Sequence, residues 1–127
     1  MEWGLVLLAD TISAARFSPL QRIARAEDER VYADGVLRRF LADPGATVRR
    51  RAVLAVGRLQ DSTAIPDLLP LLADSDPEVK REAIFALGQI GLAQPGAAAQ
   101  ARGALEKTLP GADVATAGLA LEALGKL

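Results

Sequence analysis

Residues 72–91 read LADSDPEVKREAIFALGQIG, and residues 41–60 read LADPGATVRRRAVLAVGRLQ. The two stretches align at a shift of 31 residues without a gap, with small residues on small residues and apolar residues on apolar residues. A third, shorter copy is ALEALGKL at residues 120–127, which follows AIFALGQI at residues 83–90 at a shift of 37. Internal repeats of this length predict a solenoid built from stacked helical units.

The later half of each copy has the period of an amphipathic helix. Asp76 before Pro77 predicts a helix start, because Asp accepts hydrogen bonds from the first turn and Pro needs no donor there. The apolar stripe that follows is Val79, Ala83, Ala86, Leu87 and Ile90, matched by Val48, Ala52, Ala55, Val56 and Leu59. Residues with this spacing lie on one face of a helix. Gly91 is the expected end of the second copy's helix.

An apolar segment precedes each of these helices, so each unit is predicted to be a helical hairpin. The segments are residues 34–42, 64–73 and 97–109. Ser62 or Thr63 is expected to cap the middle segment. Pro70 is expected to kink it, because proline lacks an amide proton and crowds a preceding carbonyl.

Glycine recurs at one fixed place in the three copies, as Gly57, Gly88 and Gly125. A glycine inside a helix lowers its stability, so a repeated one needs a reason. We expect that the backbones of neighbouring helices approach closely at these positions.

The composition narrows the possible chemistry. The chain has 127 residues, contains no Cys and no His, and carries a net charge of −1. Disulfides, Cys/His zinc sites and Ser-His or Cys-His nucleophile pairs are therefore excluded. We expect no catalytic residues, no metal site and no cofactor, and we predict that this chain is not an enzyme. The net charge provides no general attraction to nucleic acid.

The run Arg49-Arg50-Arg51 is the strongest hint of nucleic-acid binding. Successive residues of a helix point about 100° apart, so the three side chains do not form one basic patch. We favour ion pairs in which Arg49 and Lys80 reach back to Asp43 and Asp74 of the preceding turns. Nucleic-acid binding is the less favoured hypothesis.

Asp76-Pro77-Glu78-Val79-Lys80, followed by Ala83 and by residues 86–91, resembles the short bacterial form of the HEAT repeat. The resemblance covers residues 34–127 and implies an all-α fold, a right-handed α-solenoid of helical hairpins. It implies a single domain, residues 1–127. Within that domain we expect N-terminal capping helices at 1–33 and repeats at 34–60, 61–92 and 93–127.

A finer resemblance involves residues 23–30, 40–44 and 57–61, which look like the start of bacterial proteins that fuse HEAT repeats to a cyclophilin-type peptidylprolyl isomerase. The isomerase domain of those proteins is a β-barrel, and no part of this sequence has its alternating strand pattern. No catalytic residue is therefore carried over. Two hypotheses stand: a stand-alone scaffold for a protein or peptide partner, and the repeat portion of a larger bacterial enzyme.

The side of the second helices opposite the buried stripe is the expected partner-binding surface. Its residues are Arg50, Leu54 and Arg58, then Arg81, Phe85 and Gln89, then Gly118, Glu122 and Lys126. Phe85 beside Arg81 resembles an interface hot spot, because aromatic and Arg side chains supply most interface energy. The alternative is that Leu54 and Phe85 pack against adjacent helices as ordinary core.

The two ends of the chain carry separate predictions. The apolar run at residues 3–9 is too short to span a bilayer, and Glu2 stands where a signal peptide has positive charge. We favour an N-terminal helix, with a second helix beginning at Ser18-Pro19, over a signal peptide or foreign leader. Without a signal peptide, the expected location is the cytoplasm. At the other end, residues 117–124 are apolar on more than one side. This pattern predicts either a truncated protein or self-association through the C-terminal end.

Overall fold

The computed structural model describes residues 17–32 and 35–127, and all regular elements in these ranges are helices. The α-helices are α2 (Pro19–Asp28), α3 (Val36–Leu41), α4 (Ala46–Leu59), α5 (Ile65–Leu68), α6 (Pro77–Ala93), α7 (Ala98–Glu106) and α8 (Val114–Gly125). Three short 3₁₀ helices join them: η1 (Ser62–Ala64), η2 (Leu69–Ala73) and η3 (Pro95–Ala97). The capping helices were predicted at residues 1–33, of which residues 1–16 and 33 lie outside the described residues.

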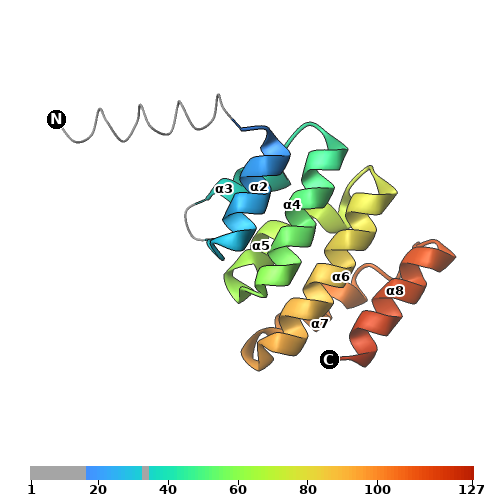
Figure 1. Cartoon of the computed structure of the whole chain (residues 1–127). Coiled ribbons are helices and arrows are strands. Elements are labelled where there is room, and N and C mark those ends of the chain that lie inside the picture. Colours follow the sequence, from blue (N-terminus) through green and yellow to red (C-terminus); the bar gives the residue numbers. More distant parts are fainter. Residues whose placement is uncertain (1–16, 33–34) are drawn as a thin grey trace.

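The helices form two layers. Helices α2, α4, α6 and α8 lie side by side in one layer, which we call the second layer. In it α4 packs against α2 and α6, and α6 packs against α8 (Figure 1). The first layer consists of helix α3, the pair α5 and η2, and helix α7, and it covers α4 and α6. Each unit contributes one helix to each layer, so the predicted α-solenoid is confirmed.

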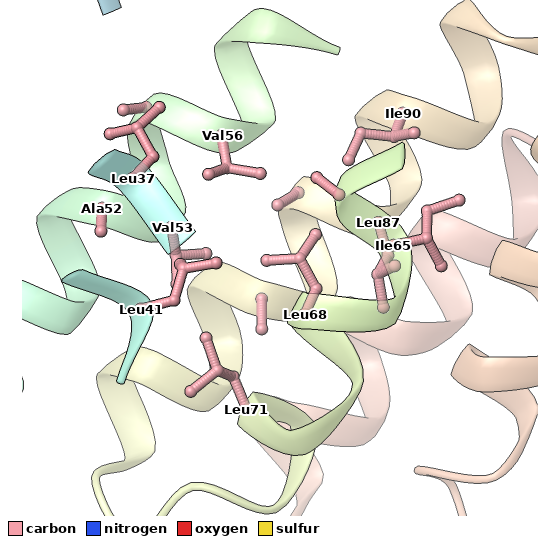
Figure 2. Packing of buried hydrophobic residues seen from close by; sticks show 14 of the residues in the cluster. Leu37, Leu41, Ala52, Val53, Val56, Ile65, Leu68, Leu71, Leu87 and Ile90 are labelled. Carbon is pink, nitrogen blue, oxygen red and sulfur yellow. The ribbon is translucent and has the colours of Figure 1, made fainter. Parts of the chain in front are cut away.

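The core lies between the two layers. Leu37, Leu68 and Ile65 of the first layer meet Val53 and Leu87 of the second layer, and all are fully buried (Figure 2). Complete burial of a side chain of this size contributes about 1.5–3 kcal/mol to stability. The core therefore consists of the apolar stripes that the repeat pattern predicted.

The helix starts follow local sequence rules. Asp76 is the N-cap of α6, and its carboxylate accepts from the amides of Glu78 and Val79. Ser18 caps α2 in a capping box with Gln21. The predictions at Asp76 and Ser18 are confirmed, because each side chain supplies an acceptor that the first helical turn lacks.

Three predictions about helix boundaries are wrong. Neither Ser62 nor Thr63 caps the middle segment, because Asp61 accepts from the amide of Thr63 instead. Pro70 does not kink a continuous helix: α5 ends at Leu68 and the chain continues as the 3₁₀ helix η2, which has proline in its first turn. Helix α6 also runs past Gly91 to Ala93, since Gly91 is buried against Ala101 and the last residue of the chain.

Two of the three repeated glycines lie where the second-layer helices approach one another. A Cβ built on Gly57 would lie 3.1 Å from the Cβ of Ala86, and a Cβ on Gly88 would lie 3.1 Å from that of Ala123. The predicted close approach is therefore confirmed between α4 and α6 and between α6 and α8. At Gly125 an added Cβ would have no described atom within 4 Å.

Candidate partner-binding face

The candidate partner-binding face is the outer side of α4, α6 and α8. Its most exposed predicted members are Arg50, Arg58, Phe85, Gly118, Glu122 and Lys126, whereas Leu54, Arg81 and Gln89 are half-buried. Phe85 is 43% exposed. The alternative that Phe85 is an ordinary core residue does not fit this exposure, although its ring does contact the side chain of Lys126.

A shallow hollow of about 190 Å³ lies between α6 and α8. It is lined by Gln60, Phe85, Gly88, Gln89, Leu92, Leu119, Glu122, Ala123 and Lys126. The fold thus brings four of the predicted residues together: Phe85, Gln89, Glu122 and Lys126. Arg50, Leu54, Arg58 and Arg81 lie outside the hollow, and Gly118 does not line it either.

Sequence reasoning missed two apolar residues of the hollow. Leu92 is 59% exposed on α6, and Leu119 is half-buried on α8. Helical spacing could have found them, because Leu92 lies seven residues after Phe85 and Leu119 lies seven before Lys126, which places each pair on one helix face. The predicted surface contains one residue per helical turn, so it does not include Leu92 and Leu119.

Lys126 lies across one side of the hollow. Its ammonium is 5.8 Å from the centroid of the Phe85 ring and 3.7 Å from a carboxylate oxygen of Glu122. Both contacts are exposed to solvent, so each stabilises the fold only weakly. A partner that displaces Lys126 from the ring therefore loses little in doing so.

Carboxylate side chains lie close to the arginines of this face. Glu78 lies 2.6 Å from Arg81 and 3.9 Å from Arg50. Glu27 of α2 accepts from Arg51 at 2.6 Å and from Arg58 at 3.0 Å. Burial raises the pKa of Glu27, but the hydrogen bonds from the two arginines outweigh it and hold the pKa below its ordinary value. The face is therefore a mosaic of both signs of charge.

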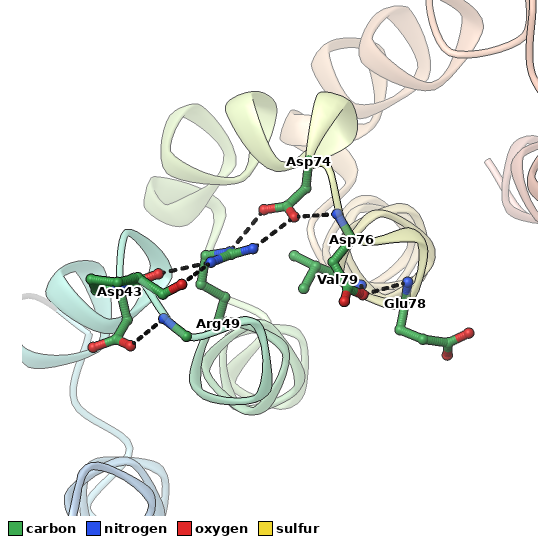
Figure 3. A network of polar contacts seen from close by, with 8 residues as sticks. Asp43, Arg49, Asp74, Asp76, Glu78 and Val79 are labelled. Carbon is green, nitrogen blue, oxygen red and sulfur yellow. Dashed lines mark hydrogen bonds and ion pairs between the residues drawn. The ribbon is translucent and has the colours of Figure 1, made fainter.

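Arg49 does not form the ion pair that the sequence predicted. Its guanidinium donates to the main-chain carbonyls of Asp43 and Pro44, at 2.9 and 3.0 Å, rather than to the carboxylate of Asp43. The same guanidinium makes two bonds, of 2.9 and 3.0 Å, to the carboxylate of Asp74 in the next unit (Figure 3). The ion pair of Arg49 therefore joins neighbouring units instead of closing one unit on itself.

A second polar cluster ties the first layer together. Tyr32 donates its hydroxyl proton to Asp67 of α5, and Arg38 of α3 lies 3.0 Å from the same carboxylate. Burial and the hydrogen bond to Asp67 raise the pKa of Tyr32 to about 12. This cluster joins Tyr32, which follows α2, to α3 and α5.

Within residues 17–32 and 35–127, no group of three acidic, His or Cys side chains could hold a metal ion. None of the helices in the same ranges combines the length and apolar character that a membrane crossing needs. What the face offers is a small apolar hollow with charged groups of both signs around it.

Comparison with known proteins identifies the repeat. The sequence profile of the family described as HEAT repeats matches residues 33–125. No curated protein matches the chain in a sequence search. Because the profile covers most of the chain and the two-layer helical stack agrees with it, this chain belongs to the HEAT-repeat family.

Proposed function

We propose that this chain is a non-catalytic scaffold that binds a protein or peptide through its second-layer helices, with an apolar side chain of the partner seated in the hollow between α6 and α8. HEAT repeats generally mediate protein interactions. The observation that carries the proposal is the exposure of Phe85 and Leu92 at the rim of one hollow. Isolated exposed apolar residues are common on protein surfaces, but two beside a hollow indicate a binding site.

The size of the hollow favours a protein side chain over a small-molecule ligand. Pockets for drug-sized ligands have volumes of about 300–1,000 Å³, whereas this hollow has about 190 Å³. A single apolar side chain on a peptide or a partner helix fits such a space. Gln60 and Gln89 at its edge can exchange hydrogen bonds with the partner's main chain.

The charges of the face also favour a polypeptide over nucleic acid. Arg49, Arg50 and Arg51 each lie within 4.0 Å of a carboxylate, at 2.9, 3.9 and 2.6 Å. Phosphate binding depends on unneutralised Lys and Arg, so these pairs reduce the attraction for a nucleic-acid backbone. A mosaic of both signs instead selects a partner with complementary charges.

The test is capture of partners from a lysate followed by calorimetric titration of a captured protein. Phe85→Ala should weaken binding at least tenfold, which corresponds to about 1.4 kcal/mol. Leu69→Ala is the matched control, because Leu69 is also an exposed apolar residue but lies in η2 of the other layer. Unchanged affinity for Phe85→Ala, or loss of affinity only with Leu69→Ala, would overturn the proposal.

A further inference from the structure

The outer edge of α8 carries an exposed stripe that shares only Gly118 with the partner-binding face. Val114 is 91% exposed and Leu121 is 58% exposed, although both are large apolar residues. Gly118 and Gly125 lie on the same side of the helix, and a Cβ added to either would meet no described atom within 4 Å. The four residues have the spacing 4, 3 and 4, which makes one continuous stripe along a helix. We call Val114, Gly118, Leu121 and Gly125 the α8 stripe.

Two of the four positions of the stripe match buried packing positions of the preceding units, whereas the other two match Arg81 and Pro77, which are half-buried and exposed. Leu121 corresponds to Ile84 of α6 and Val53 of α4 at the shifts of 37 and 31, and both of those residues are fully buried. Gly125 corresponds to Gly88, which lies against Ala123 of the next helix. Leu121 and Gly125 of the α8 stripe therefore continue the helix-packing surface of the stack, without a neighbouring helix among the described residues.

The glycines of the stripe are costly unless another helix packs on them. A glycine in a helix interior lowers stability by about 1 kcal/mol relative to alanine. Gly88 has a structural reason in its contact with Ala123, whereas Gly118 has none within the described stack. Close approach of a further helix backbone supplies that reason.

The order of large and small residues makes the stripe complementary to itself. If a second α8 packs antiparallel across a two-fold axis between residues 119 and 120, residues whose numbers add to 239 face each other. Val114 then faces Gly125 of the second copy, and Gly118 faces Leu121 of the second copy. Each large side chain fills the space above a glycine, as a self-complementary two-fold interface requires.

The charges at the helix ends favour the same arrangement. In the antiparallel pair, the end of α8 that begins at Asp113 lies level with the end that carries Lys126 in the second copy. The two helix dipoles are then also opposed, which is favourable. Glu122 lies level with Ala117 of the second copy, so like charges do not meet across the pair.

We propose that two copies of this chain associate through the α8 stripe as an antiparallel two-fold dimer. A second copy fits the α8 stripe because the large residues and the glycines of the stripe are complementary to one another in the antiparallel register. An interface of one helix pair is small, so the dimer forms at high protein concentration and dissociates on dilution.

Sedimentation equilibrium of the full chain tests the association. The wild-type chain should approach the dimer mass at protein concentrations up to about 1 mM. Leu121→Glu should remain a monomer with a nearly unchanged melting temperature, because the side chain is exposed in the monomer. Leu69→Glu, which places the same charge on the other layer, should still associate. A wild-type chain that remains monomeric at the highest concentration overturns the proposal.

Cysteine cross-linking tests the orientation, since the chain has no native cysteine. An equimolar mixture of Val114→Cys and Gly125→Cys should form a disulfide-linked dimer. Each variant alone should not, because residues 11 positions apart on a helix are about 16 Å apart along its axis, beyond the reach of a disulfide. Cross-linking of Val114→Cys with itself would indicate parallel helices and overturn the proposal. Phe85→Ala should leave both results unchanged, which separates this interface from the partner-binding face.

Discussion

Arg49 of α4 connects two consecutive turns of the stack: it donates to the carbonyl of Asp43 in its own unit and, through two nitrogens, to the carboxylate of Asp74 in the next. The Asp74 carboxylate in turn accepts from the amide of Asp76, directly before α6. The pair is largely buried, with side-chain exposures of 14% and 8%. It therefore fixes the start of α6 relative to α4. The position equivalent to Asp74 in the third copy is Gly111, so this connection is not repeated there.

Removing one partner of this pair should destabilise the stack. Asp74→Ala should lower the free energy of unfolding by about 2–3 kcal/mol, because it leaves a mostly buried guanidinium without its charged acceptor. Glu29→Ala is the control, since Glu29 forms an exposed pair with Arg25. Urea unfolding followed by circular dichroism measures both. Equal decreases in the free energy of unfolding for the two substitutions would show that the inter-unit pair stabilises the chain no more than an exposed pair does.

Acid should weaken the fold through the same carboxylates. The hydrogen bonds from Arg49 hold the pKa of Asp74 below its ordinary value, and the pKa of Glu27 is also lowered. A group whose pKa is lowered by folding stabilises the protein fully above its unfolded pKa, about 4, and loses that contribution as pH falls through its folded pKa. The melting temperature should therefore decrease as the pH is lowered below about 4. Asp74→Asn should flatten this dependence; an identical pH profile in the variant contradicts the assignment.

Tyr32 provides an internal reporter at high pH, because it is the single tyrosine of the chain. Burial and the hydrogen bond to Asp67 raise its pKa to about 12. A raised pKa stabilises the fold below the ordinary tyrosine value, about 10, and this contribution is lost as pH rises through the folded value. Absorbance at the tyrosinate band should thus titrate near pH 12 unless the chain unfolds first. Asp67→Asn should lower the midpoint, and titration of the wild-type chain near pH 10 while it is still folded would rule out the buried hydrogen bond.

The close approach of α4 to α6 should tolerate no larger residue at Gly57. A Cβ there would already lie 2.8 Å from the Gln89 side-chain oxygen and 3.1 Å from the Ala86 Cβ, so Gly57→Val should destabilise the chain by about 2 kcal/mol. Gly103→Ala in α7 is the contrast, because no described atom outside its own helix backbone lies within 4 Å of its added Cβ. It should stabilise the chain by about 0.5–1 kcal/mol. Thermal unfolding distinguishes the two signs.

Phe85 and its neighbour Ile84 should respond differently to truncation. Ile84 is fully buried, so Ile84→Ala should cost about 3–4 kcal/mol through lost burial and a cavity. Phe85→Ala should cost about 1 kcal/mol, since the ring is already 43% exposed. Chemical denaturation of the two variants gives both values. A cost for Phe85→Ala as large as that for Ile84→Ala would restore the interpretation of Phe85 as core.

Most of the fold could be predicted from periodicity, because helix packing depends on which residues recur every three or four positions. The stripe through Val79, Ala83 and Leu87 is buried as predicted, and two of the three matched glycines, Gly57 and Gly88, lie at helix contacts. The helix ends were harder to predict. Gly91 looks like a helix end in sequence, but its buried contact with Ala101 lets α6 continue.

The candidate site was only partly predictable. Phe85, Gln89, Glu122 and Lys126 face the same hollow as their helical spacing indicated. Gln60 could not be placed there from spacing, because it follows the end of α4 in a left-handed conformation. Its position depends on how the chain leaves one helix, which is decided outside the repeat pattern.

The sequence by itself determined the class of fold, the faces that each helix buries and the absence of cysteine and histidine chemistry. These follow from residue type and period, which are local properties of the chain. Only the tertiary structure decided that Arg49 pairs with Asp74 rather than Asp43, and that the hollow forms between α6 and α8. Both depend on the distance between neighbouring units, which the packing of glycine against alanine sets. Contacts between units arise from that spacing, and residues distant in sequence meet only once the helices have stacked.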